Sequence, residues 1–233
     1  EGGAPVRTPA PKATLRTSWA RGLETSELPK EATRKGALFA RAPTWPREYP
    51  LPMRRMTVDV VIEDQVARTT IDATFFNQTW QQLEGVYRLS LPAGAAVSRL
   101  AMYVEGKLME GGIVERKRGR EIYESIVHRR RDPALLEWME GQKLAVRIFP
   151  LPGRTEKRLL VSYTQSVERL YDTWQLRLPL PQTDNDVGEM AVRVRVVRGG
   201  VELSSSTHPL KVEQNGEDLV ASWDGRSLRP APE

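Results

Sequence analysis

Apolar and polar residues alternate along most of the chain from residue 56 onward, a pattern typical of strands that bury one face. The alternating segments are rich in valine, isoleucine and threonine, which favour extended structure. Glu105-Gly106 and Pro152-Gly153 separate neighbouring segments in the manner of tight turns. The pattern predicts about seven strands before residue 169, over residues 56–65, 66–78, 85–92, 95–104, 107–115, 142–151 and 156–167.

One long stretch, residues 113–138, departs from this alternation and has the spacing of a helix. Ile122, Tyr123 and Ile126 fall on one helical face, and basic residues spread over the rest. Asp132-Pro133 ends the pattern, because proline disfavours helical geometry in the residue before it. We therefore predict one principal helix within residues 114–131, with its apolar face buried against the strands.

A second set of short strands is predicted after residue 169. Turn signals containing glycine separate segments of alternating polarity, at Gly188, Gly199-Gly200, Asn215-Gly216 and Asp224-Gly225. Regular short strands of this kind are typical of a β-sandwich. The predicted fold class is thus mainly β, a β-sandwich with one principal α-helix followed by a second small β-sandwich-like region.

Residues 1–50 show no sustained period and are rich in proline, alanine, arginine and threonine. This composition predicts an extended or partly disordered arm, which limited proteolysis would trim to a body that begins near Pro50. A basic tail for nucleic acid or anionic lipid is the alternative, but the charges are scattered, which favours a linker. Parts of the arm would attach to the body through large apolar side chains, namely Trp19, Leu38, Phe39, Trp45 and Tyr49.

Five segments together resemble the VIT domain, the vault protein/inter-alpha-trypsin module. They are VARTTIDATFFN, VYRLSLPAGAAVSRLAMYVEGK, IVERKRGREIYESIV, ALLEW and RIFPLPGRTEKRLLVSY, in matching order and spacing. The residues at characteristic positions of the family are Glu115, Tyr123, Leu135, Leu136, Glu137, Pro152 and Gly153. The helix departs from the family pattern at Gly119, where alanine is common.

The resemblance implies a structural and interaction module without catalytic residues. VIT modules usually precede a von Willebrand factor type A domain, and residues 170–228 are similar to the β-rich connector between the two. The type A domain itself would follow in the full-length protein, since its Asp-x-Ser-x-Ser signature is not in the sequence. The expected organisation is an arm at 1–50, a VIT domain at 51–168, a connector at 169–228 and a linker at 229–233.

The net charge of +5 is unevenly distributed. Residues 1–55 contain 11 Lys or Arg and 5 Asp or Glu, a balance of +6, and the rest contain 24 and 25, a balance of −1. A second basic cluster lies on the predicted helix and its end. We take it as the candidate interaction surface, with a protein partner expected; polyanion or nucleic-acid binding through the arm and this helix is the alternative. Its residues are Arg116, Lys117, Arg120, Arg129, Arg130 and Arg131.

Little in the sequence points to catalysis, a metal or a cofactor. There is no cysteine, and the two histidines, His128 and His208, are far apart, where a zinc site needs three or four ligands. Neither a Gly-x-Ser-x-Gly motif nor a phosphate-binding loop occurs. Glu115 would favour the helix start through the helix dipole, and Glu137 would pair with an arginine, so both are expected to be structural. An unrecognised hydrolase is the weakest interpretation.

The compartment stays open from the sequence. No apolar run approaches the roughly 20 residues of a membrane helix. The chain begins with Glu1 and shows no signal peptide, so we expect a processed product or a piece of a longer protein. Arginine outnumbers lysine by 27 to 8, as in products of GC-rich genomes, and an exported or cell-envelope protein of a bacterium is favoured.

Overall fold

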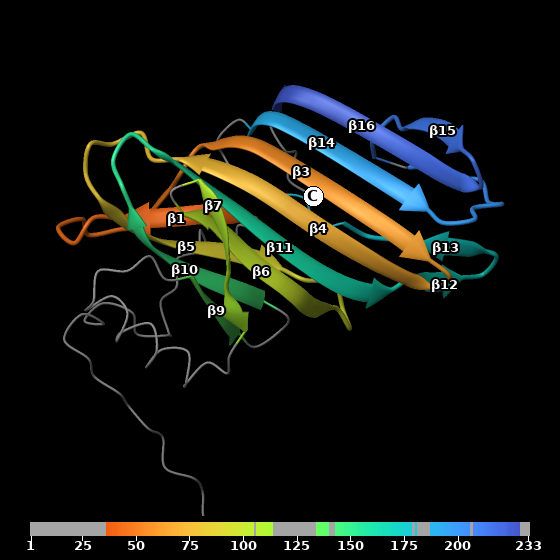
Figure 1. Cartoon of the computed structure of the whole chain (residues 1–233), viewed down its shortest axis with the longest axis horizontal. Helices are drawn as coiled ribbons and strands as arrows, with labels where there is room; N and C mark the ends of the chain where they lie inside the picture. Colours follow the sequence, from red (N-terminus) through yellow and green to blue (C-terminus); the bar gives the residue numbers. More distant parts are fainter. Residues whose placement is uncertain are drawn as a thin grey trace, which may run out of the picture. The chain divides into compact units, whose positions relative to one another are not determined.

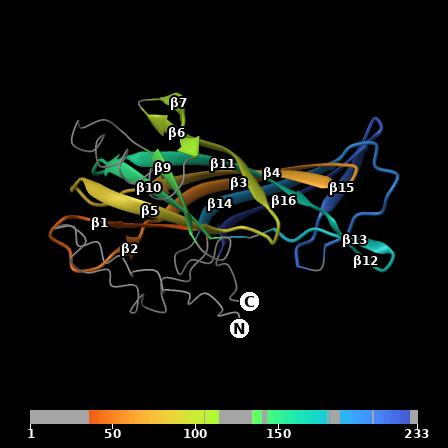
Figure 2. The same ribbon diagram turned by 90° about the horizontal axis from the view of Figure 1, so that it is seen from below.

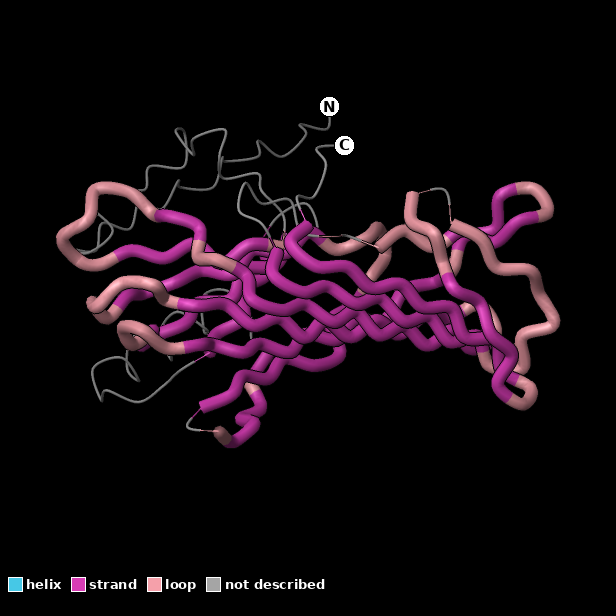
Figure 3. Tube along the Cα trace, turned by 90° about the horizontal axis from the view of Figure 1, so that it is seen from above, coloured by secondary structure: helices cyan, strands magenta, loops and turns pink. Residues whose placement is uncertain are grey.

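The structure is a computed structural model of the chain and describes residues 36–104, 106–113, 134–139, 143–178, 180, 187–205 and 207–228. These residues form strands and loops, without a helix among them (Figure 3). The prediction of a mainly β protein is therefore confirmed. The helix predicted within residues 114–131 lies outside the described residues and stays a prediction.

The smaller of two main sheets has six strands, in the order β2-β1-β5-β10-β9-β8 (Figure 1). Neighbouring strands are antiparallel, except that β8 runs parallel to β9. In chain order the strands are β1 (Ala37–Arg41), β2 (Tyr49–Pro50), β5 (Leu83–Ser90), β8 (Gly112–Ile113), β9 (Ala134–Met139) and β10 (Lys143–Leu151).

The larger sheet has eight strands, in the order β15-β16-β14-β3-β4-β11-β6-β7. All neighbours are antiparallel except β14 and β3. Its strands are β3 (Met53–Glu63), β4 (Val66–Phe76), β6 (Ala96–Val104), β7 (Lys107–Glu110), β11 (Glu156–Ser166), β14 (Val187–Val196), β15 (Lys211–Asn215) and β16 (Asp218–Leu228). A separate hairpin consists of β12 (Glu168–Leu170) and β13 (Thr173–Gln175).

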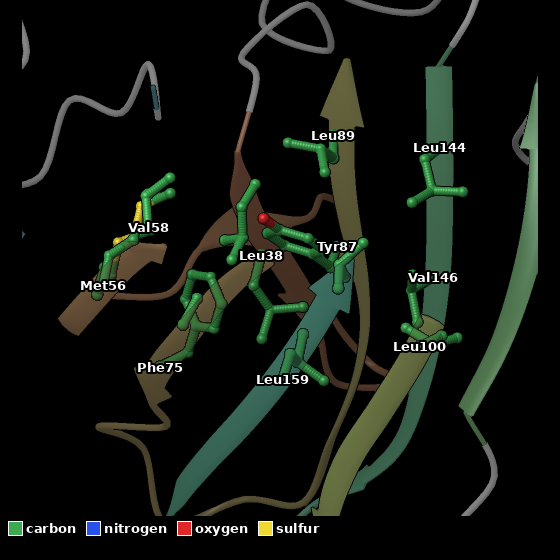
Figure 4. Packing of buried hydrophobic residues seen from close by; sticks show 14 of the residues in the cluster. Leu38, Met56, Val58, Phe75, Tyr87, Leu89, Leu100, Leu144, Val146 and Leu159 are labelled. Carbon is green, nitrogen blue, oxygen red and sulfur yellow. The ribbon is translucent and has the colours of Figure 1, made fainter. Parts of the chain in front are cut away.

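The two sheets share one hydrophobic core, so the fold is a β-sandwich (Figure 2). Alternate residues of β3 and β4 are buried, because successive side chains of a strand point to opposite faces. Figure 4 shows the core from close by, where side chains from both sheets point toward one another. The Phe75 ring of β4 lies 5.7 Å from the Tyr87 ring of β5, centroid to centroid, and joins the two layers.

Strand β1 shows where the last part of the predicted arm, residues 1–50, is attached to the body. It lies between β2 and β5 in the smaller sheet, and its first four residues are buried. Leu38 and Ala40 are completely buried, so these residues belong to the core. The strand was missed because a short run that is buried on both faces shows no alternation, and prolines follow it closely.

Two corrections concern the central and C-terminal segments. The ALLEW segment, for which we predicted no strand, belongs to β9 and pairs with β10. Strands β14, β15 and β16 do not form a second small sandwich; they extend the larger sheet, with β14 hydrogen-bonded to β3. The domain boundary at 168/169 stays a prediction, although hydrogen bonding within this sheet continues across it.

The core contains polar atoms that lack hydrogen-bond partners among the described residues: Thr69 Oγ1, Gln165 Oε1 and the hydroxyls of Tyr87 and Tyr163. Tyr163 stands opposite Thr69 in the register of β11 and β4. Burial raises the pKa of Tyr163 to about 12. The facing Thr69 hydroxyl is close enough to oppose this rise in part, but the two hydroxyls do not meet in hydrogen-bonding geometry. Burial also raises the pKa of Tyr87, and the neighbouring Tyr163 adds to that rise.

Tyr163→Phe is therefore expected to leave the free energy of unfolding at pH 8 unchanged or higher, because an unpaired buried hydroxyl costs about 1–3 kcal/mol. The pKa of Tyr163 is higher in the folded than in the unfolded state. Ionisation of Tyr163 therefore does not affect the free energy of unfolding below about pH 10. It lowers the free energy of unfolding as the pH rises from about 10 toward 12. Urea unfolding at pH 8 and pH 11 should show a smaller alkaline loss in the variant. Tyr171→Phe, at an 89% exposed position, is the control; a clear loss for Tyr163→Phe at pH 8 would contradict the prediction.

Candidate interaction surface

Three loops gather at one end of the sandwich, where they connect strands of the two sheets (Figure 1). They are residues 42–52 between β1 and β3, which include the two-residue strand β2, residues 77–82 after β4 and residues 152–155 between β10 and β11. In the figure they are the orange, yellow and green loops at the left. Loops positioned by a rigid scaffold are a common place for binding residues.

A single buried side chain, Asn77, ties two of these loops together. Its Nδ2 donates toward the backbone carbonyls of Gln81 at 2.9 Å, Leu151 at 3.0 Å and Pro152 at 3.0 Å. Its Oδ1 accepts hydrogen bonds from the backbone nitrogen and the hydroxyl of Thr79, at 3.0 and 2.8 Å. Both hydrogens of the amide and its oxygen are thus used, which fixes the side chain at 2% exposure.

The loop at Gly153 approaches the neighbouring loop too closely for any side chain. A Cβ atom at this position would overlap the backbone of Trp80. The backbone nitrogen of Arg154 donates to the carbonyls of Asn77 and Thr79, each at 2.9 Å, and its guanidinium donates to the Gln78 carbonyl at 3.0 Å. These contacts fix the backbone of the loop that carries Trp80, a residue that is 86% exposed.

A groove of about 590 Å³ lies beside this contact, lined by Trp45, Pro46, Tyr49, Pro50, Leu51, Gln78 and Thr79. The rings of Trp45 and Tyr49 stand nearly perpendicular, at 86°, with their centroids 5.6 Å apart. A backbone hydrogen bond of 3.0 Å from Trp45 to the Ala42 carbonyl closes the turn that presents the indole. The lining is therefore mainly apolar, from two aromatic rings, two prolines and a leucine, together with the polar residues Gln78 and Thr79.

Arginine side chains stack on the aromatic rings next to the groove. The Arg54 guanidinium lies 4.6 Å from the centre of the Phe76 ring, and Arg154 lies 5.4 Å from Phe76 and 5.2 Å from Trp80. Such contacts contribute about 0.5–1 kcal/mol at exposed sites, so they orient the side chains more than they stabilise the fold. We call Trp45, Tyr49, Gln78, Trp80 and Arg154 the loop-end surface.

The charge of this end is positive. Within the described part of the chain, no carboxylate forms an ion pair with Arg47, Arg54 or Arg154. Glu48 is nearby, but its carboxylate is already paired with Arg88 at 2.7 Å. An approaching partner would thus meet exposed aromatic rings and uncompensated positive charge. Tryptophan, tyrosine and arginine are the residues enriched at the energetic centres of protein interfaces.

Most residues of the candidate site predicted from sequence lie outside the described residues. This holds for Glu115 and Tyr123 and for all six basic residues, Arg116, Lys117, Arg120, Arg129, Arg130 and Arg131. Leu135, Leu136 and Glu137 lie on β9, opposite Arg147, Val146 and Ala145 of β10 in the register. Their predicted structural roles, and the interaction role of the basic cluster, stay predictions.

Of the two histidines, His208 lies within the described residues. His208 contacts the Thr207 hydroxyl at 2.9 Å through Nδ1 and the Trp223 ring at 4.5 Å between centroids, whereas His128 lies outside the described residues. Within the described ranges, acidic and histidine side chains do not gather in groups of three that could hold a metal ion. Those ranges also contain no helix long and apolar enough to cross a membrane.

Sequence reasoning missed Asn77, Trp80 and Arg154 as parts of a site, although it placed a turn at Pro152-Gly153 and marked Trp45 and Tyr49 as large apolar side chains in the arm. One local feature of the sequence could have indicated a turn at Asn77. A threonine follows two residues later, and Asn and Thr side chains favour turns because they form hydrogen bonds with nearby backbone groups.

The arrangement of strands and the loop-end surface defines a β-sandwich protein without a recognisable catalytic constellation in its described part. Residues 53–163 match the family described as the vault protein inter-alpha-trypsin domain. These residues, which run from β3 almost to the end of β11, are a VIT domain. No curated protein sequence shows significant similarity to the chain.

Solved structures resemble the chain only distantly. A candidate nutrient binding protein from Legionella pneumophila is 11% identical, with a TM-score of 0.49 over 78% of this chain and 64% of its own. An M1 zinc metallopeptidase from Deinococcus radiodurans is 13% identical, with a TM-score of 0.42 over 75% of this chain and 39% of its own. The chain spans less than two thirds of either protein, and neither likeness bears on its function.

Proposed function

We propose that the chain is a non-enzymatic protein-interaction module. The observation that carries the proposal is the loop-end surface, where an almost fully exposed tryptophan stands on a loop whose backbone is held by a second loop. A loop backbone that is already fixed loses little conformational entropy when a large aromatic side chain on it binds, which favours that side chain as an anchor. The VIT family, known mainly for structural and interaction roles, supports the same conclusion.

We further propose that the module is the N-terminal part of a larger protein, with a von Willebrand factor type A domain in the same full-length chain. The support is the usual order of these modules and the β-rich character of residues 169–228. The full open reading frame tests it directly. An Asp-x-Ser-x-Ser signature downstream of Glu233 would agree with the proposal, and a reading frame that continues without one would contradict it.

Site-directed photocrosslinking tests the interaction role. A photoreactive phenylalanine analogue at Gln81, next to Trp80, is expected to crosslink to one or a few discrete proteins in an extract of the source organism. The same analogue at Gln214, an exposed glutamine on the edge strand β15, serves as the matched control. Equal products from both positions, or products that nuclease removes, would contradict a protein-interaction role for this end.

A further inference from the structure

We propose that the chain associates with copies of itself head to tail, with the hairpin of β12 and β13 in one copy bound at the loop-end surface of the next. This inference rests on the proposed role in protein interaction and names the partner, a second copy of this chain. It depends on the exposed apolar side chains of the hairpin, on the opposite charges of two ends of the sandwich and on the distance between those ends.

The hairpin exposes three large apolar side chains. β12 and β13 pair with each other and form a sheet separate from the two main sheets. Tyr171 is 89% exposed, Leu170 49% and Trp174 46%. The Arg169 guanidinium lies 5.8 Å from the centre of the Trp174 ring, and its Nε donates to the Tyr171 carbonyl at 3.1 Å. The hairpin is thus an apolar projection whose own contacts fix its shape.

Tyr171, at the tip of the hairpin, has a backbone conformation that is unfavourable for tyrosine. Its φ is 54°, in the left-handed region, where glycine, asparagine and aspartate are the usual residues of a tight hairpin turn. Packing within the chain does not compensate for this strain, because the side chain is almost fully exposed. Strained backbone of this kind gathers at sites of function. A contact outside the molecule therefore explains this tyrosine better than the stability of the turn does.

The end of the sandwich that carries the hairpin is acidic. The β3–β4 turn lies beside the hairpin, because the Val167 nitrogen donates to the Gln65 carbonyl at 2.8 Å. The end of β14 and the β15–β16 turn adjoin it, since Val196 faces Ile62 of β3 and Leu219 of β16 in the register. The exposed acidic residues of these turns and the hairpin outnumber the cations there: they are Glu63, Asp64, Glu168, Asp172 and Glu217, against Arg169 and Arg198.

The loop-end surface complements the hairpin in both apolar area and charge. It presents the exposed residue Trp80 and the mainly apolar groove beside it. Arg47, Arg54 and Arg154 make it positive and form no ion pair within the described residues. Opposite charges attract and orient an approaching copy, whereas two hairpin ends or two loop ends repel each other. The charge thus favours a head-to-tail contact over a symmetric pair.

The two ends are too far apart to meet within one molecule. β11 begins at Glu156, directly after the loop of residues 152–155, and ends at Ser166, two residues before the hairpin. Eleven extended residues span about 35 Å. In Figure 1 the hairpin lies at the right and the three loops at the left. A contact between two different patches leaves one of each patch free on the outer copies, so further copies can add.

Sedimentation velocity of the full chain at rising concentration tests the proposal. We expect species larger than a dimer in low salt, and association about tenfold weaker at about 1 M salt, which screens the opposite charges. The hairpin variant Tyr171→Gly should weaken association by roughly tenfold or more, as for an interface anchor. Its melting temperature should be nearly unchanged, because glycine adopts a positive φ without strain. The loop-end variant, Trp80→Ala with Arg47→Glu, should weaken association to a similar extent.

Mixing the two variants tests the head-to-tail geometry. The hairpin variant keeps its loop end and the loop-end variant keeps its hairpin, so one contact forms and assembly stops at a dimer. Met109→Ala, at a 55% exposed position on β7, is the control and should associate like the wild type.

Three results would overturn the proposal: a wild-type chain that stays monomeric at millimolar concentration in low salt, a hairpin or loop-end variant that associates as tightly as the wild type, or a mixture that stays monomeric. Binding of a monomeric chain to phosphatidylcholine vesicles that is lost in Tyr171→Gly would also overturn it, in favour of a membrane interface.

The two proposals fail in different ways. If the chain stays monomeric while Gln81 crosslinks to other proteins in the extract, the head-to-tail inference is wrong and the interaction role stands. If the variants abolish self-association while Gln81 and Gln214 give equal products in the extract, the head-to-tail contact stands and the interaction role with other proteins is contradicted.

Discussion

Replacing Leu38 with alanine is expected to lower the free energy of unfolding by about 2–5 kcal/mol, the range for a leucine truncated in a packed core. Leu38 is completely buried in β1, opposite Tyr87 of β5, and its carbonyl accepts a hydrogen bond of 2.8 Å from Leu51. Figure 4 shows its side chain near the core residues Phe75 and Tyr87. Urea unfolding followed by circular dichroism measures the loss.

The matched control is Leu170→Ala on the β12 hairpin, where 49% of the side chain is exposed. Its effect should stay within about 0.5 kcal/mol. Similar small losses for both leucines would mean that residues 37–41 are only loosely attached to the body. The structure instead predicts that a body trimmed to Pro50 is unstable, because β5 would lose its neighbour across five paired residues.

The predictable part of the fold is the part in which burial alternates. β3 and β4 could be predicted from sequence because one face of each strand packs on the core and the other meets solvent. The same reasoning failed for β1, where consecutive residues are buried. It also could not find the partners of β14, because its pairing with β3 joins residues more than 130 positions apart and leaves no local trace.

The candidate site was less predictable because it depends on contacts between residues that are far apart in the sequence. A sequence shows which side chains are unusual for a loop, such as Trp45 and Tyr49, but not which loops meet. The loop-end surface exists because Asn77 contacts backbone groups 74 and 75 residues further along the chain. Gly153 illustrates the limit: the sequence marked it as a turn, whereas the structure also requires glycine for its close approach to Trp80.

Asn77→Asp is expected to destabilise the protein at pH 7 by about 3–5 kcal/mol, comparable to an uncompensated buried charge. The change replaces the Nδ2 donor with a carboxylate oxygen and leaves the side-chain volume almost unaltered. That oxygen would face the carbonyls of Gln81, Leu151 and Pro152, so three attractive contacts become repulsive.

Gln78→Glu is the control for this prediction, since it makes the same chemical change at the adjacent, exposed residue. Its effect on the free energy of unfolding should remain within about 0.5 kcal/mol. Urea unfolding of both variants gives the comparison. A loss below about 1 kcal/mol for Asn77→Asp would mean that the loops yield and admit water to the new carboxylate. In that case the loop-end surface would not be held by Asn77, and the exposure of Trp80 would need another cause.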